Sequence, residues 1–242
     1  MIMPYMIVMT IHGHGSQVMT ACYIPWIMLF LFKVIERFTL LDFTFLSLFI
    51  GLQLQRGHIQ IAYYTWMMIG LYILINIFDS IYAKKVNIYK LIKKYLIIFS
   101  SLITGILLSF NLYYPVLNYS QYSNRGMEKG GIGIENATNW SFSFKESLTF
   151  FFPSSLGFGG ELYKTIGNMP FTDYPNYLGI ILIIFSVFGL AKVKIKNIYK
   201  IFFILVLIFS FSLSLGKHFI GFYNLFYNYL PFFDKFTYEI LL

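Results

Sequence analysis

The sequence has few charged residues for its length. Only 12% of its 242 residues are Asp, Glu, Lys or Arg, whereas about a quarter of a typical soluble domain is charged. Hydrophobic residues make up 58% of the chain, and they are grouped in long runs. These features exclude an ordinary soluble globular domain.

Cysteine and familiar catalytic motifs are also scarce. Cys22 is the only cysteine, so no disulfide can form within the chain. The sequence contains no nucleotide-binding loop, no HExxH, no GxSxG and no paired-cysteine signature. No motif in the chain therefore names a reaction by itself.

Long apolar runs predict the fold class. Three of them approach the roughly 20 residues that a helix needs to cross a bilayer, and backbone facing lipid must satisfy its own hydrogen bonds. We therefore predict an all-α polytopic membrane protein with about six or seven transmembrane or re-entrant helices. The long runs are 38–54, 59–78 and 95–114; the shorter ones are a partial run at 1–11, a span at 18–32 kinked at Pro25, 176–191 and 201–215.

The spacing of these runs predicts three regions. Residues 1–114 form an N-terminal transmembrane helical block, and 115–175 form one large extracytoplasmic loop. Within that loop, 143–155 predicts a short helix in the membrane interface, with three phenylalanines pointing toward the lipid. Residues 176–242 form a transmembrane hairpin and an aromatic extracytoplasmic segment that suits a re-entrant or membrane-lying structure.

The basic residues predict the orientation. Eleven Lys and Arg residues fall in alternate connections that hold only two acids, which gives a net charge of +9 on that side. On the other side, seven bases meet seven acids. The positive-inside rule places the basic side in the cytoplasm, so the basic excess is an orientation signal and does not imply nucleic-acid binding. All four histidines then lie on the extracytoplasmic side: His12, His14, His58 and His218.

The stretch "HGHGSQ" at 12–17 directly precedes a predicted helix. Its glycines let a ligand approach the backbone, and N–H groups at a helix start favour phosphate, so His12, His14 and Gln17 are candidate ligands of a lipid-linked phosphate. The alternative is a glycine-rich turn with two interfacial histidines. A metal site is less favoured, because His-x-His supplies two ligands and no third has familiar spacing.

A second candidate follows in "LQRGHIQIAYY" at 54–64. Arg56 can pair with a phosphate through two N–H groups, His58 can donate or shuttle a proton, and Gln60 lies one turn later. The alternative is a snorkelling arginine beside aromatic-belt tyrosines. Asp42 lies near a helix start, where a carboxylate suits the helix dipole, and we interpret it as structural.

Four stretches of the chain carry a resemblance to a known family. They are "GHGSQVMTACYIPWIML" (13–29), "GLQLQRGHIQIAYYT" (51–65), "FFPSSLGFGGELYKTIGNMPFTDYPNYLGIILI" (151–183) and "SLGKHFIGFYNLFYNYLPFFDKF" (214–236). In these stretches, whose order and spacing also match and which cover most of the chain, it resembles the YfhO-like bacterial membrane proteins of the GT-C-type glycosyltransferase superfamily.

The resemblance implies transfer of a sugar from a polyprenyl-phosphate donor to a cell-envelope polymer or glycolipid, at the outer face of the bacterial cytoplasmic membrane. Arg56, His58, His12 and His14 would stabilise the leaving phosphate, with or without a divalent metal; no cofactor is evident. Asp173 is the candidate acid, and its alternative role is to cap the helix that follows.

In the superfamily the catalytic acid lies in the first extracytoplasmic loop, and no acid precedes His12. Both ends of the chain also look cut, so we expect a fragment of a longer protein that lacks this acid. Two rival functions remain: a transporter or flippase of lipid-linked saccharide, which would want ionisable residues near the bilayer midplane, and a non-catalytic membrane scaffold.

Overall fold

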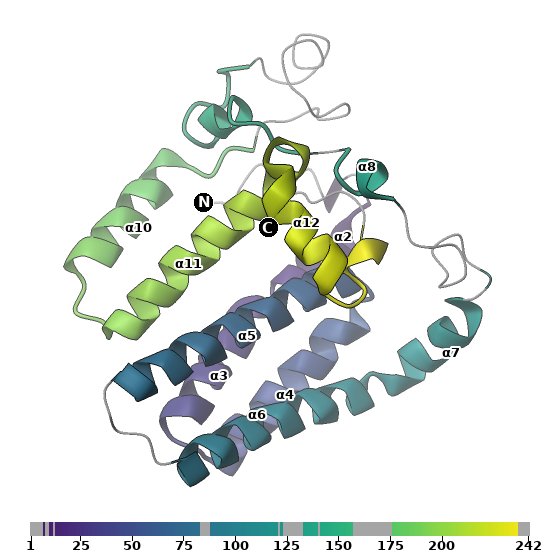
Figure 1. Ribbon diagram of the computed structural model, residues 1–242, viewed down its shortest axis with the longest axis vertical. Coiled ribbons are helices and arrows are strands. Elements are labelled where there is room, and N and C mark those ends of the chain that lie inside the picture. The colour runs from purple at the N-terminus through teal and green to yellow at the C-terminus, as the bar shows by residue number, and fades with distance from the viewer. Residues whose placement is uncertain are drawn as a thin grey trace. The chain divides into compact units, whose positions relative to one another are not determined.

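The computed structural model describes residues 7, 10–11, 13–82, 88–120, 122, 133–139, 141–156 and 176–236, and all regular structure in these ranges is helical (Figure 1). Four helical segments in them are long and apolar enough to cross a membrane: Gly15–Glu36, Ile59–Tyr82, Leu91–Leu108 and Asn197–Ser214. Two shorter apolar helices, Leu40–Gln55 and Ile180–Lys192, accompany them. The prediction of an all-helical chain with helices long and apolar enough to cross a membrane is confirmed, and the number of spans stays a prediction.

The chain divides into two compact units. The first unit is His14–Tyr119, and the second combines Met1–Gly13 with Ser120–Leu242. Each unit is described by itself below. The three-region division of the sequence stays a prediction.

The first unit begins with a kinked segment. Helix α2 (Gly15–Ala21) ends at Cys22, and α3 (Ile24–Glu36) begins two residues later with Pro25 in its first turn. Proline suits this position because the N–H that it lacks would have no partner inside the helix. The helical segment is thus interrupted just before Pro25, and the kink itself stays a prediction.

Three further apolar helices complete this unit, followed by a shorter one. They are α4 (Leu40–Gln55), α5 (Ile59–Tyr82), α6 (Ile88–Leu108) and α7 (Phe110–Ser120). The run at 95–114 was expected to be one helix, but the structure interrupts it at Ser109. The Ser109 N–H donates to the Ile106 carbonyl at 3.0 Å, a bond to the third residue back that tightens the turn between α6 and α7.

The core of the first unit lies where α4 meets α3 and α6 (Figure 1). Ile27 and Leu31 of α3 and Leu46 and Ile50 of α4 are fully buried there. Helices α4 and α6 approach closely because glycine stands at the contact: a Cβ at Gly105 would lie 2.5 Å from Cγ2 of Ile50. Small residues allow such close packing in membrane helices.

The second unit contains short helices around two apolar ones. In chain order they are α8 (Ile134–Ala137), η2 (Glu146–Phe150), α10 (Ile180–Lys192), α11 (Asn197–Ser214), η3 (Gly216–Phe219), α12 (Ile220–Tyr229) and η4 (Phe233–Lys235). The segment 141–142 is tied to the end of α11. The Phe142 N–H donates to the Ser214 carbonyl at 2.8 Å, and the Lys217 N–H donates to the Ser141 hydroxyl at 2.8 Å.

The predicted interfacial helix at 143–155 is shorter than expected. Only Glu146–Phe150 is helical, with 3₁₀ geometry, and its start is closed by a reciprocal pair of bonds between Ser143 and Glu146. Phe150 stacks on the fully buried Phe142 at 5.1 Å, so this side chain packs inside the unit and does not simply point toward lipid.

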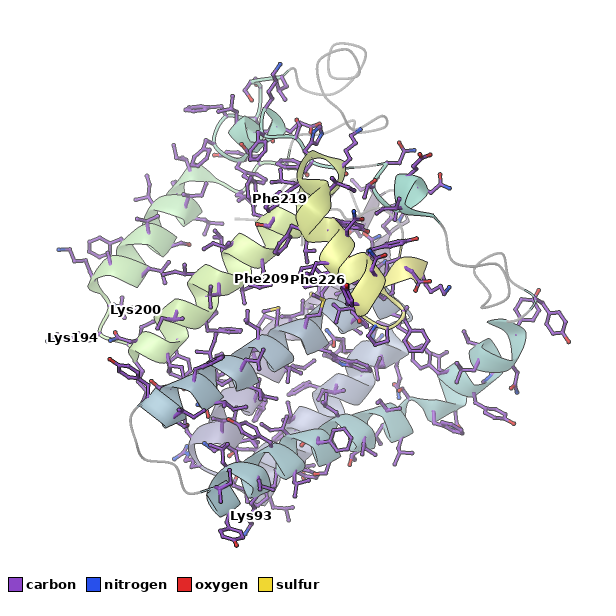
Figure 2. All side chains as sticks on the ribbon, viewed as in Figure 1. Lys93, Lys194, Lys200, Phe209, Phe219 and Phe226 are labelled. Atoms are coloured by element: carbon purple, nitrogen blue, oxygen red, sulfur yellow. The ribbon has the colours of Figure 1, made fainter. Side chains whose placement is uncertain are left out.

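The aromatic segment after α11 folds into helices that pack on it. Phe209 of α11 contacts Phe222 and Phe226 of α12, with ring centroids 5.7 and 6.1 Å apart (Figure 2). Tyr223 and Phe233 are fully buried in the same cluster. Burial raises the pKa of the Tyr223 phenol.

Candidate functional site

The candidate site lies at the end of the first unit where α4 gives way to α5. Arg56 caps α4, and the Gly57 N–H donates to the Leu54 carbonyl at 3.1 Å. Gly57 has φ +78, a conformation that side chains with a Cβ rarely adopt. The turn "RGH" is therefore tight and places Arg56 and His58 at the same end of the unit.

Arg56 is exposed and lies over an aromatic ring. The carbon of its guanidinium is 5.9 Å from the ring centroid of Tyr23, which precedes α3. A guanidinium beside an aromatic face keeps its N–H groups along its edge, where they can bind a phosphate. The contact with Tyr23 also limits the positions that this flexible side chain can take.

The structure brings His14 near enough to His58 for their charges to interact, although they are 44 positions apart in the chain. His14 precedes α2 and is exposed, whereas His58 is half-buried. Burial lowers the pKa of the His58 imidazole; an electrostatic interaction with its own backbone opposes this shift, and the charge of His14 adds to it. Neutral His58 therefore predominates at pH 7. A neutral imidazole can accept a proton, whereas it does not offer a permanent positive charge to a phosphate.

One residue that the sequence analysis did not select holds this end together. Gln53 is fully buried on α4, and its Nε2 donates to the Thr65 hydroxyl at 2.8 Å and to the Thr20 carbonyl at 3.2 Å. These bonds join α4 to α5 and α2, the helices that carry His58 and His14 at their starts. The sequence did contain one indication of this role, because Gln53 is a polar residue inside an apolar run, three residues before Arg56.

Two buried polar atoms here lack a hydrogen-bond partner in the part of the chain that the structure describes. They are Oε1 of Gln53 and Nδ1 of His58. Buried polar atoms usually find a partner in a protein, in ordered water or in a ligand. This end of the unit therefore retains hydrogen-bonding capacity for a polar ligand or for water.

The other predicted site residues fall into two groups. Gln17 is half-buried on α2, where its N–H donates to the His14 carbonyl at 3.0 Å, and Gln60 Nε2 donates to the Tyr64 hydroxyl at 2.9 Å. Both lie in the first unit beside the residues above. His12 and Asp173 lie outside the described residues, so their roles stay predictions.

The structure supports the structural interpretation of Asp42. This residue is buried in the first turn of α4, where its N–H donates to the Thr39 hydroxyl at 3.1 Å and its Oδ2 accepts from that hydroxyl at 2.5 Å. Asp42 thus belongs to a helix cap. Within the described ranges, no group of three or more His, Cys, Asp and Glu side chains is arranged to hold a metal ion.

Comparison with known proteins yields no relative: no family model, no curated protein and no solved structure matches the chain. The YfhO-like resemblance therefore remains a hypothesis that rests on the stretches quoted above.

Proposed function

We propose that the end of the first unit formed by His14, Arg56 and His58 binds the phosphate of a polyprenyl-linked sugar. The protein then transfers this sugar to a cell-envelope polymer or glycolipid at the outer face of the bacterial cytoplasmic membrane, which it crosses several times. The observation that carries the proposal is the exposed Arg56 guanidinium held over Tyr23, in a unit whose helices are suited to a membrane.

The chemistry of this end fits a lipid-linked phosphate. Such a phosphate lies at the membrane surface, where Arg56 offers a fixed positive charge and two N–H groups. In the transfer, a hydroxyl oxygen of the acceptor attacks the anomeric carbon. The bond from that carbon to the phosphate oxygen breaks, and the phosphate leaves with the electron pair. Arg56 stabilises the charge that develops on the leaving phosphate.

The proton of the acceptor hydroxyl needs a base. Asp173 is our candidate for this role, as a carboxylate near the start of the 176–191 run. His58 is the candidate to exchange a proton with the phosphate, because its lowered pKa leaves it neutral before the ligand binds. A bound phosphate would raise that pKa, since a nearby negative charge favours the imidazolium.

A transporter or flippase is the second function to test. Ionisable residues of the candidate spans lie near their ends, as with Lys33, Asp79 and Lys93. Transport proteins commonly place such groups near the bilayer midplane. This distribution favours surface chemistry over transport.

The experiment is a transfer assay in membranes that contain the protein expressed from its complete reading frame, with radiolabelled polyprenyl-phosphate sugars as donors. Arg56→Ala should lower the transfer rate by about 10²-fold, the usual effect of removing one group that stabilises developing charge. Arg56→Lys keeps the charge but loses the two-pronged geometry, so its rate should be intermediate.

The matched control is Arg37→Ala, which removes an exposed arginine that caps the other end of α3. It should transfer sugar at the parent rate. Unchanged transfer by Arg56→Ala would remove Arg56 from the site. If the protein moves the lipid-linked sugar between leaflets without transferring it, it is a flippase. If it shows neither transfer nor movement, the scaffold function is favoured.

A further inference from the structure

A cluster of lysines lies where α10 and α11 are joined in the second unit. Figure 2 shows Lys194 and Lys200 at this end of the two helices. Three of the four lysines are exposed, and the sequence contains no Asp or Glu between positions 176 and 233. The four, which we call the lysine cluster, are Lys192, Lys194, Lys196 and Lys200.

Helix stability does not account for this cluster. Lys192 lies in the last turn of α10, where a positive charge suits the helix dipole. Lys196, however, is the N-cap of α11, and Lys200 follows one turn later. Cations at a helix start oppose the dipole, and the first turn of α11 has no acid to balance them. At the start of α11, the lysines therefore concentrate positive charge where the helix dipole does not favour it.

Apolar side chains are interleaved with the lysines. Val193 and Ile195 alternate with them in the connection and are 49% and 38% exposed. On α10, Phe185 and Phe188 are 68% and 59% exposed, and α11 is long and apolar enough to cross a membrane. Where an apolar helix ends in exposed lysines and exposed apolar side chains, that end is suited to lie among the lipid headgroups.

We propose that the lysine cluster binds the phosphates of anionic phospholipids in the membrane leaflet that it faces. Lysine is a mobile point charge on an apolar stem, so its stem can lie along the acyl chains while its ammonium reaches a headgroup phosphate. Val193 and Ile195 favour a lipid surface over a soluble anion, because a soluble partner would leave them in water. This inference is independent of the proposed glycosyl transfer.

The test measures lipid selectivity of the whole chain in nanodiscs. Phosphatidylcholine nanodiscs carry a small fraction of spin-labelled phosphatidylglycerol, or of spin-labelled phosphatidylcholine, and the motionally restricted fraction gives the relative affinity of the protein for each. The parent chain should prefer phosphatidylglycerol, and added salt should weaken this preference. Each lysine near a membrane surface contributes about fivefold in affinity for anionic lipid.

The test variant replaces the whole lysine cluster with glutamine. Its matched control replaces Lys129, Lys145, Lys164 and Lys217, so both variants lose four positive charges. The cluster variant should prefer phosphatidylglycerol much less than the parent chain does, and the control should keep the parent selectivity. Arginine at all four cluster positions should also keep it, because the charge is retained.

Equal selectivity of the cluster variant and the parent overturns the proposal. An equal loss in both glutamine variants also overturns it, because net charge alone would then explain the effect. Binding of soluble polyphosphate with unchanged lipid selectivity would assign the cluster to a soluble partner. If the fourfold variant does not fold, the single variant Lys194→Gln is used in its place, because Lys194 is exposed in the connection. This variant should show about fivefold lower selectivity for phosphatidylglycerol than the parent chain.

Discussion

The contact between α4 and α6 allows a sharp test of the structure. A Cβ added at Gly105 would lie 2.5 Å from Cγ2 and 2.8 Å from Cβ of Ile50, and 3.1 Å from the Ser47 carbonyl oxygen. Ile50 is fully buried, and its Cβ is attached directly to the helix backbone. Gly105→Ala can therefore be accommodated only if the two helices move apart.

The magnitude follows from a comparison with a second glycine. A Cβ at Gly70, inside α5, would meet no atom within 4 Å. Both Gly→Ala changes raise helix propensity equally. The difference between the free energies of unfolding of the two variants therefore measures the cost of overpacking at Gly105. Overpacked cores lose about 1–3 kcal/mol, which corresponds to roughly 5- to 150-fold in the folding equilibrium. Gly105→Ala should be less stable than Gly70→Ala by this amount.

The assay is unfolding of the full chain in mixed micelles by titration with sodium dodecyl sulfate, followed by tryptophan fluorescence. Trp26 and Trp66 both lie in the first unit, and Trp140→Phe in every variant limits the signal to that unit. The separation of α4 from α6 should also weaken the bond from Gln55 Nε2 to the Leu108 carbonyl, which is 3.0 Å long and lies beside Arg56. Equal stability of the two alanine variants would refute the close packing of α4 on α6.

Three further predictions concern the site and the second unit. Gln53→Ala removes the bonds that join α4 to its neighbours and leaves their partners buried, so the same titration should show a loss of about 1–3 kcal/mol. The pKa of His58 is lower in the folded chain than in the unfolded chain. Below pH 6.5 the unfolded chain therefore binds the proton more readily, and the free energy of unfolding decreases. His58→Gln should reduce this acid sensitivity, as measured by thermal unfolding above and below that pH, and an unchanged pH dependence would contradict the assignment. Gly216 has φ +40, and a Cβ there would overlap the Ser141 hydroxyl, so Gly216→Ala should expose the 141–156 segment to limited proteolysis, whereas Gly221→Ala, which meets no atom, should not.

Much of the fold could be predicted from residue type alone. The apolar runs located α5 and α11 to within a few residues, and Pro25 marked the interruption before α3. The prediction was wrong at Ser109, where a tight backbone turn separates α6 from α7. Hydrophobicity does not register this turn, because the run is apolar on both sides of it.

The candidate site was predicted only in part. The turn at Arg56 and His58 could be read from Gly57, because a tight turn with positive φ needs a glycine. The role of Gln53 could not, since its bond to Thr20 joins residues 33 positions apart. The direction of the His58 pKa shift likewise depends on burial by neighbouring helices.

The sequence by itself determined that this chain is built from apolar helices suited to a membrane, because each helix satisfies its own backbone hydrogen bonds and needs only a long run of apolar residues to do so. The tertiary structure alone decided which faces of those helices meet: Gly105 against Ile50, Gln53 against Thr65, and Arg56 over Tyr23. These contacts depend on how closely two helices can approach and at what angle, and side chains distant in the chain set both.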